Sequence, residues 1–302
     1  MEKFLQELAW RDYWQQVWIA KGDAINSDLK RPQEGITNHE MPAAVLKAET
    51  GIRALDQAID EFYDSGYLHN HLRMYIASVC CNTGGSHWNT PARWMYYHLL
   101  DGDWASNALS WQWVAGSNSG KKYYANQENI NKYCYTRQNG TFLDVGYDEV
   151  QYMPVPDVLN KTISPDLVTP LPEKQDISID QERPVLVYNH YNIDPLWHRE
   201  SNANRILLLE PSHFEKYPVS AKTIDFVLAF GANIPGLQVF ASEFNELKTL
   251  AGDAELVFKE HPAFRHYRGT CENRDWMFTV TGYFPSFFAF WKKCRKELGK
   301  WS

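Results

Sequence analysis

The sequence lacks the features that would place a protein in a membrane or outside the cell. No stretch approaches the roughly 18 uncharged apolar residues of a membrane-spanning helix, and the acidic start has no basic segment followed by an apolar run. The five cysteines are odd in number and form no CxxC pair, so neither a disulfide framework nor a zinc site is indicated. These absences predict an unexported, cytoplasmic protein with no membrane partner and no metal.

Common phosphate-binding and catalytic motifs are missing as well. Gly84-Gly85 and Gly231 fit neither the GxGxxG nor the GxxxxGK[ST] pattern, and there is no GxSxG or HExxH sequence. The formal net charge of −7 argues against nucleic-acid binding through overall charge, because phosphate neutralisation needs clustered Lys and Arg. Any contact with DNA must therefore come from a local basic rim.

Aromatic residues, in contrast, are abundant. The chain of 302 residues contains 12 Trp and 17 Tyr, which indicates either a large aromatic core or stacking surfaces for a planar ligand or for bases. The length and the 44% hydrophobic content allow two domains of ordinary size.

Apolar spacing in the first half is typical of helices. Helices are predicted, from their apolar stripes and from capping or first-turn residues, over Glu2 to Lys21, Pro42 to Gly66, about Leu68 to Cys80, and Thr90 to Leu100. No strand pattern interrupts them. Residues 1–150 are therefore expected to form an all-helical domain, and the proline-rich residues 151–183 a linker.

The second half alternates short apolar runs with helical patterns. Strands are predicted at Pro184 to Tyr188, Ile206 to Leu209, Leu237 to Phe240 and Glu255 to Phe258, with helices after Ser220, over Ser242 to Leu250 and over Pro285 to Leu298. Such alternation implies a small parallel sheet with right-handed crossovers. The expected fold class is thus α + α/β: an all-helical domain followed, over residues 184–302, by a small α/β domain with an aromatic C-terminal helix.

A dense run of polar groups stands among the aromatics of the helical half. Asn70, Arg73 and Met74 lie within about one helical turn and share a face. An arginine on an apolar face needs a carboxylate, which Asp101 or Asp103 can supply. From spacing alone, a structural ion pair inside a helical bundle is the preferred interpretation.

The joint order of these motifs is more specific than any one of them. It runs Glu7-Leu8-Ala9-Trp10-Arg11, Thr50-Gly51, His69-Asn70, Arg73-Met74, Asp101-Gly102-Asp103, Asn107 and Trp111-Gln112-Trp113. Over about residues 1–135 this order resembles the FAD-binding domain of DNA photolyases and cryptochromes. The α/β segment follows the helical domain instead of preceding it, which resembles a bacterial cryptochrome-like subgroup.

The resemblance implies FAD as the cofactor and assigns residues to it. Asn107 matches the residue that faces flavin N5, where an amide tunes which redox states persist. Arg73 and Asp101 match an ion pair beside the flavin ring, and Asp103 a carboxylate near the ring and ribose. The implied cofactor-binding set is completed by Arg11 and Asn70.

The resemblance also implies a cavity for a flipped pyrimidine dimer of UV-damaged DNA. Its lining would be Glu7, Trp10, Asn70, Met74 and Trp113: two flat indoles, a carboxylate acceptor and a soft gap-filler. The alternative is that both indoles are core packing.

A tryptophan chain that relays electrons to the flavin is implied next. Trp111 and Trp88 match its first two members, and the third position falls near Gly35, so the exposed end of that chain is expected to be absent or rerouted.

The family's Ser/Thr-rich segment that wraps the FAD phosphates has no counterpart upstream of Trp10, which predicts weaker FAD binding. Three functions follow as expectations. The first is a photolyase-type lyase that repairs pyrimidine dimers with an electron from reduced FAD under blue light. The second is a cryptochrome-type photoreceptor without repair activity, and the third an FAD-free fragment. The kind of dimer, an antenna chromophore and the oligomeric state are left open.

Overall fold

The computed structural model describes residues 2–299, and contacts within the chain divide it into two compact units. One unit, the α/β unit, comprises Met1–Ile19 and Val168–Ser302, and the other, the helical unit, comprises Ala20–Leu167. The sequence predicted that the helical domain ends at residue 150 and that the α/β domain begins at residue 184. The unexpected feature is that the first helix, α1 (Glu2–Lys21), groups over most of its length with the α/β unit.

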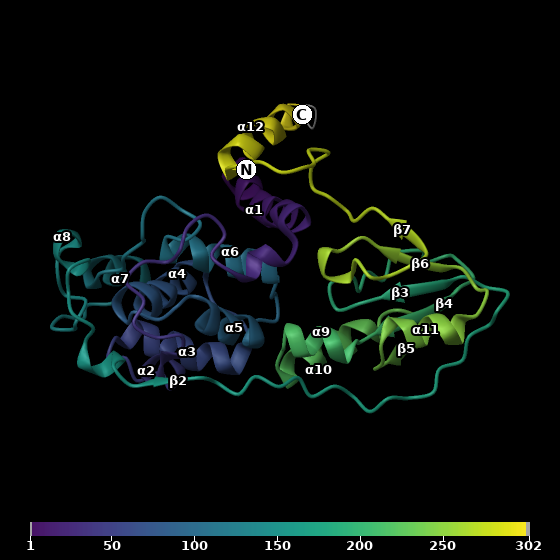
Figure 1. Cartoon of the computed structure of the whole chain (residues 1–302), viewed down its shortest axis with the longest axis horizontal. Helices are drawn as coiled ribbons and strands as arrows, with labels where there is room; N and C mark the ends of the chain where they lie inside the picture. The colour runs from purple at the N-terminus through teal and green to yellow at the C-terminus, as the bar shows by residue number, and fades with distance from the viewer. Residues whose placement is uncertain (1, 300–302) are drawn as a thin grey trace. The chain divides into compact units, whose positions relative to one another are not determined.

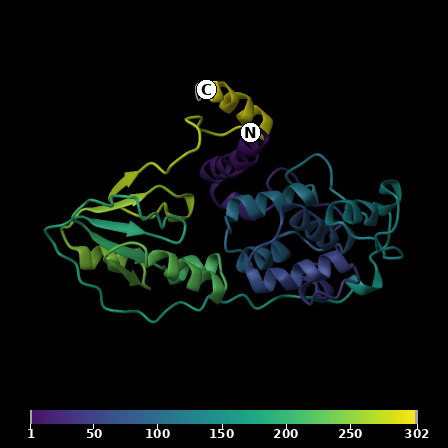
Figure 2. The same ribbon diagram turned by 180° about the vertical axis from the view of Figure 1, so that it is seen from behind.

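The helical unit has an aromatic core that includes the fully buried side chains of Trp88, Trp94 and Trp104. Figure 2 shows its helices from behind. Its longer helices are α3 (Arg53–Ser65), α4 (Asn70–Ser78), α5 (Asn89–His98), α6 (Trp104–Ala115) and α7 (Gln127–Cys134). The shorter elements are η1 (Gly22–Asn26), β1 (Met41–Pro42), α2 (Ala43–Leu46), a π-helical turn η2 (Val79–Thr83), α8 (Tyr147–Val150), η3 (Asp157–Leu159) and β2 (Thr162–Ile163). β1 and β2 pair antiparallel. The expected all-helical character is confirmed apart from this two-residue ladder.

The single helix expected from Pro42 to Gly66 is in fact two. Asp56 in the first turn of α3 accepts hydrogen bonds from the backbone N–H and the hydroxyl of Thr50, at 2.8 and 2.6 Å, and from the N–H of Gly51 at 2.9 Å. Gly51 has φ 77°, a conformation that no helix contains. The chain therefore ends α2 and begins α3 afresh, which the apolar stripe alone did not show.

Five parallel strands form the sheet of the α/β unit. They are β3 (Val185–Tyr188), β4 (Asn204–Leu208), β5 (Leu237–Phe240), β6 (Leu256–Lys259) and β7 (Thr270–Glu272), in the order β5-β4-β3-β6-β7 (Figure 1). The helices between them are α9 (Pro211–Lys216), α10 (Ala221–Gly231), α11 (Phe244–Ala251) and the 3₁₀ turn η4 (Pro262–Phe264). The predicted parallel α/β fold is confirmed. β7 was missed because its residues are mostly exposed and form no apolar run.

Helices cover both faces of this sheet, which explains why its central strands β3 and β6 are buried along their whole length. Val187 pairs with Ile206 on one side and Phe258 on the other, and these side chains belong to the cluster that packs against α11. Leu207 points to the opposite face because neighbours alternate along a strand, and there it approaches Gly231 of α10.

The last helix, α12 (Phe287–Leu298), packs along the N-terminal half of α1 in both views (Figures 1 and 2). Trp10 and Phe287 stack with ring centroids 3.6 Å apart and an interplanar angle of 11°, and Tyr13 contacts Phe290 at 5.8 Å. This aromatic seam is the physical reason that residues 1–19 belong to the α/β unit. No helix among residues 2–299 has the length and apolar character needed to cross a membrane.

Candidate functional site

The polar residues of the helical unit are positioned by the start of α6. The side chain of Asp103 caps this helix, because its Oδ1 accepts a hydrogen bond from the N–H of Ser106 at 2.7 Å. The capped register places Asp103, Asn107 and Trp111 at successive i+4 positions, so they share one face of α6. The cap at the start of α6 thus aligns a carboxylate, an amide and an indole.

Arg73 pairs with Asp101 and not with Asp103, which settles the alternative that spacing left open. Its Nη2 lies 3.0 and 3.1 Å from the two carboxylate oxygens of Asp101, and its Nε donates to the carbonyl of Leu68 at 2.7 Å. The two side chains are 25% and 48% exposed, so the pair adds little to stability. It holds a cation in a fixed place at the edge of α4.

Asn107 is a buried amide with a defined orientation. It is 8% exposed, and its Nδ2 donates to the carbonyl of Ala92 in α5 at 2.8 Å. With Nδ2 tied to α5, Oδ1 is the atom that can accept a further hydrogen bond. The site therefore contains an oriented acceptor.

Both tryptophans of the implied electron relay are buried in the helical unit. Trp88 donates from Nε1 to Asp28 Oδ1 at 2.8 Å, whereas Nε1 of Trp111 is buried with no hydrogen-bond partner among the described residues. The hydroxyl of Ser106 is likewise buried with no hydrogen-bond partner among the described residues. Buried donors without partners are uncommon in folded proteins, so Nε1 of Trp111 is a position where a bound polar group or water is expected.

The residues expected to line a lesion cavity are not equally placed. In the helical unit, Trp113 is 40% exposed, Asn70 is exposed and Met74 is half-buried. Trp113 follows Trp111 by two positions on the same helix and so faces away from it. The outward indole is thus available to a partner and the inward one is not.

The other expected residues lie on α1, in the α/β unit. Glu7 and Arg11 are exposed, and Trp10 is half-buried with one ring face covered by Phe287. The structure thus brings Arg73 together with Asp101, aligns Asp103, Asn107 and Trp111, and assigns Glu7, Trp10 and Arg11 to a different unit.

Sequence reasoning missed the partners that orient these side chains. Asp28 accepts from Trp88 Nε1, and its Oδ2 accepts from the N–H of Gln33 at 2.8 Å. The side-chain oxygen of Gln33 in turn accepts from the N–H of Trp88 at 2.9 Å. Asp28 stands 60 positions before Trp88, and no local pattern signals such a contact.

A second group, of histidines, lies at the carboxyl ends of the strands in the α/β unit. His190 follows β3 and His261 follows β6, the two neighbouring strands between which the strand order reverses. Burial lowers the pKa of His190 to about 3 and lowers that of His261 well below its usual value. His266 behaves oppositely, because a 2.9 Å contact with Glu210 raises its pKa. Within the described residues no group of three or more His, Cys, Asp and Glu side chains is arranged to hold a metal ion.

Comparison with known proteins places the helical half in a family. A family model described as the FAD binding domain of DNA photolyase matches residues 4–156, which is just over half of the chain. The chain belongs to the cryptochrome/DNA photolyase superfamily. The match runs from α1 across most of the helical unit and includes every residue that the sequence analysis assigned to the cofactor, the lesion or the electron relay.

Named members of the superfamily agree with this assignment. The chain is similar to the deoxyribodipyrimidine photo-lyase of Streptomyces griseus, at 37% identity over 117 residues, 38% of this chain and 26% of that protein. The photo-lyase of Alkalihalophilus pseudofirmus is 26% identical over 157 residues, 51% of this chain and 33% of that protein. The photo-lyase of Synechococcus sp. is 31% identical over 117 residues, 37% of this chain and 24% of that protein. The match thus spans about a quarter to a third of the length of these photolyases.

FAD is the cofactor of the matched domain, and the site residues fit it. A flavin ring needs an acceptor or donor at N5 and a defined charge at its edge. Asn107 Oδ1 is an oriented acceptor, and the Arg73–Asp101 pair supplies the charge. The unpartnered Nε1 of Trp111, one helical turn from Asn107, is consistent with a polar group filling the space beside α6.

Proposed function

We propose that this protein is a photolyase-type lyase that repairs pyrimidine dimers in UV-damaged DNA. The observation that carries the proposal is that the oriented Asn107 amide and the Arg73–Asp101 ion pair both lie in the span that matches the FAD-binding domain of DNA photolyase. When bound and reduced, FAD supplies under blue light the electron that opens the dimer. The expected place of action is the reducing cytoplasm, and the five cysteines, all free thiols, support this.

The chain's own residues prepare the site for this chemistry. Asn107 Oδ1 accepts from a protonated flavin N5 and so favours the form that carries a proton there. Arg73 favours negative charge in the adjacent ring, and Asp101 limits that effect by neutralising part of the guanidinium charge. The buried rings of Trp88 and Trp111 exclude water and offer oxidisable indoles.

On the DNA side, we assign recognition of the lesion to Trp113, Met74 and Asn70. The partly exposed indole of Trp113 presents a flat apolar surface to a pyrimidine ring, the flexible thioether of Met74 adapts to irregular shapes, and Asn70 offers hydrogen bonds to the base edges. In the same proposal Asp103 and Asn70 contribute to holding the cofactor. Glu7, Trp10 and Arg11 belong to the α/β unit, and the roles that the family resemblance implies for them stay predictions.

A repair assay tests the proposal directly. The purified chain, saturated with FAD and chemically reduced, is illuminated with blue light in the presence of an oligonucleotide that contains a pyrimidine dimer. We expect a light-dependent loss of dimers, and Trp113→Ala should lower the affinity for damaged DNA by about 5- to 140-fold, as expected for the loss of one stacking contact. Tyr152→Ala, which removes another exposed aromatic ring from the helical unit, is the matched control and should change neither quantity.

A variant at Asp101 separates the cofactor role from folding. Asp101→Asn should change the free energy of unfolding by less than about 1 kcal/mol, because the ion pair is half exposed. It should nevertheless alter the affinity for FAD, measured by quenching of flavin fluorescence. An unchanged affinity, or no dimer loss from fully FAD-loaded protein, would contradict the proposed roles.

The stack of Phe287 on Trp10 favours a second candidate, a cryptochrome-type photoreceptor without repair. A dimer bound by Trp10 needs a free indole face, and one face of this ring is already covered at 3.6 Å. A protein that binds FAD and reduces it under light, but leaves dimers intact, would support the photoreceptor over the lyase. In that case Phe287→Ala, which uncovers that face, is expected to leave dimers intact as well.

A further inference from the structure

α12 presents two chemically different faces. Phe287, Phe290, Trp291 and Cys294 recur at helical spacing and are all 5% exposed or less. This inner face is held against α1 by the aromatic contacts of Trp10 and Tyr13 described above. The helix is therefore fixed in the unit by its apolar side, and its other side is left to solvent.

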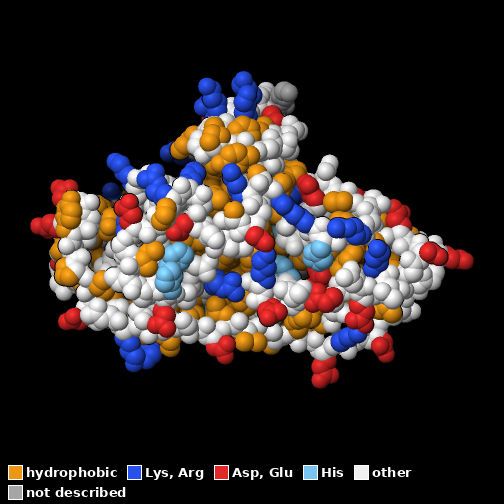
Figure 3. Space-filling model, in the orientation of Figure 1, with side chains coloured by type: hydrophobic (Ala, Val, Ile, Leu, Met, Phe, Trp, Pro, Cys, Tyr) orange, Lys and Arg blue, Asp and Glu red, His pale blue; other side chains and the backbone are white. Residues whose placement is uncertain are grey.

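The outer side carries one aromatic ring followed by cations. Phe288, Lys292, Arg295 and Lys296 stand at i, i+4, i+7 and i+8, which places them along one stripe of the helix, here called the α12 stripe. Phe288 is 69% exposed. In Figure 3 Lys and Arg side chains gather over α12 above a band of hydrophobic surface.

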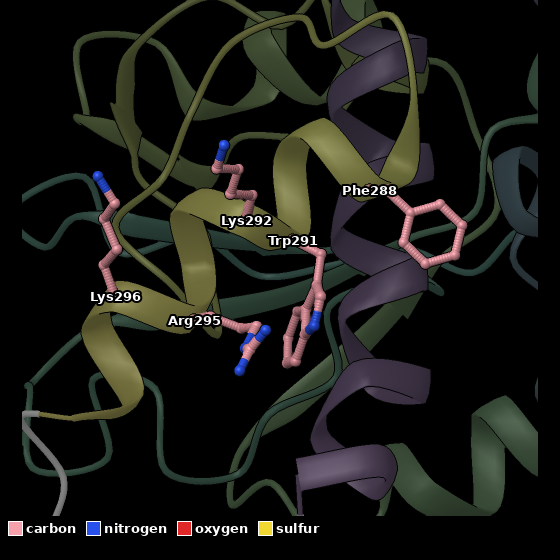
Figure 4. Close-up of a pocket in the computed structure, with 5 residues that line it drawn as sticks. All are labelled: Phe288, Trp291, Lys292, Arg295 and Lys296. Carbon is pink, nitrogen blue, oxygen red and sulfur yellow. The ribbon is translucent and has the colours of Figure 1, made fainter.

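An open pocket of about 410 Å³ lies along the α12 stripe and is lined by the stripe residues and Trp291. Figure 4 shows how these side chains extend: Lys292 and Lys296 on one side, Trp291 and Arg295 next to each other on the other, and Phe288 at the N-terminal end. The pocket thus combines the flat ring of Phe288 with N–H donors on both of its sides.

The charge of the stripe is only partly compensated. Arg295 donates from Nε to Glu2 Oε1 at 2.8 Å. Lys292 and Lys296 form no ion pair with any described residue, and they are separated by about 6 Å along the helix axis, since each residue rises 1.5 Å. Two uncompensated ammonium groups at this spacing, in a chain of net charge −7, form a local basic site.

We propose that the α12 stripe binds single-stranded nucleic acid, with Lys292 and Lys296 on phosphates of the strand and Phe288 stacked on an unpaired base. Cations along a groove together with an exposed aromatic ring are what unpaired strands require, whereas a duplex hides its base faces from Phe288. The proposal deepens the proposed function and rests on it, because damaged DNA is the polymer on which a photolyase acts.

A membrane surface is the other polyanion that a basic aromatic helix can meet. Binding to a bilayer requires the apolar face of the helix to enter the headgroup region. In α12 that face is buried against α1, and only Phe288 is left as an exposed apolar side chain of the stripe. The packing therefore favours a nucleic acid over a bilayer.

Fluorescence anisotropy with the full chain and a lesion-free single strand of about 12 nucleotides, in the dark and over a series of salt concentrations, tests the proposal. For Lys292→Gln/Lys296→Gln we expect the slope of log K against log salt to fall by about 1.4, since each phosphate contact on a single strand contributes about 0.7. Phe288→Ala should weaken binding to the strand by about 5- to 140-fold and leave duplex binding unchanged. The matched control is Lys161→Gln/Lys248→Gln, with the same charge change at exposed positions elsewhere in the chain, and it should keep the wild-type slope.

The outcomes are distinct. A wild-type slope for the α12 double variant, or equal losses for both double variants, overturns the proposal. Binding to anionic phosphatidylserine vesicles that depends on Phe288, without strand binding, overturns it in favour of a membrane. Because the probe carries no lesion and the assay needs no light, a failure here leaves dimer repair unaffected, and a failure of repair leaves this binding measurable. Thermal melting monitored by circular dichroism verifies that each variant is folded.

Discussion

Lowering the pH from about 7.5 to about 5 should destabilise the α/β unit, because three of its imidazoles are buried in the neutral form. His190 follows β3, His261 follows β6, and His213 lies in α9 between β4 and β5. Burial is the main cause that lowers the pKa of each, to about 3 for His190 and well below the usual value for the other two.

Local geometry supports the neutral forms. Nε2 of His190 and Nε2 of His213 are buried with no hydrogen-bond partner among the described residues. Nδ1 of His261 accepts a hydrogen bond from the N–H of Ala263 at 3.2 Å, which a protonated Nδ1 cannot do. A proton on any of these rings would therefore create a buried charge or break the cap of η4.

The sign and size of the effect follow from linkage. A histidine whose native pKa lies below the unfolded value of about 6.5 has no effect on stability above that pH. As the pH falls below it, the unfolded state takes up protons and the native state does not, so stability is lost until the native pKa is reached. For His190, with a native pKa of about 3, the loss at pH 5 is about 2 kcal/mol. His213 and His261 add losses of the same sign. The total loss of stability is then a large share of the roughly 5–15 kcal/mol by which domains are stable.

Two variants test this reasoning. The stability of β3 and β6 is measured by amide hydrogen exchange, corrected for the intrinsic pH dependence of exchange. His190→Phe keeps an aromatic ring beside Tyr191 and should flatten the pH dependence by about 2 kcal/mol between pH 7.5 and 5. His266→Gln should steepen it, because the raised pKa of His266 contributes stability that is present below about pH 6.5 and lost as the pH rises through the native pKa. If β3 and β6 are as stable at pH 5 as at pH 7.5, or if both variants show the same pH dependence, the buried neutral imidazoles are not the cause.

Two further predictions concern the helical unit, and urea unfolding followed by circular dichroism measures both. Asp28→Ala should lower the free energy of unfolding by about 1–3 kcal/mol, because it leaves the buried Nε1 of Trp88 and the N–H of Gln33 without an acceptor; Asp28→Asn, which keeps one acceptor, should cost less. Gly66→Ala should cost about 1–3 kcal/mol, because Gly66 ends α3 with φ 68° and an added Cβ would lie 2.6 Å from Cγ of Leu100; a loss of less than about 0.5 kcal/mol would contradict this account of the helix end.

Features that depend on neighbouring residues could be predicted from the sequence. α1 runs from Glu2 to Lys21 as its apolar spacing indicated, and Ser220 caps α10 by accepting from the N–H of Thr223 at 3.3 Å. The parallel order of β3 and β4 followed from strands alternating with helices. In each case the decisive interactions lie within a few residues or in a repeated pattern.

Contacts between distant segments could not be predicted in the same way. The pairing of Trp88 with Asp28 and the split between α2 and α3 depend on side chains whose roles become visible only in the folded unit. The choice of Asp101 over Asp103 as partner of Arg73 was likewise open, because both carboxylates stand at the same junction. It is resolved by Asp103 serving as the cap of α6.

The same distinction bears on the function of α1. The local motif around Glu7, Trp10 and Arg11 carries the family resemblance, but the packing of this helix is determined by α12, some 277 positions later, where Phe287 stacks on Trp10. A motif specifies which side chains are present, whereas the partner of the helix decides which of their faces a ligand can reach. α12 therefore joins the two proposals made for this protein, because one face of it covers a residue assigned to the lesion and the other carries the cations assigned to the strand.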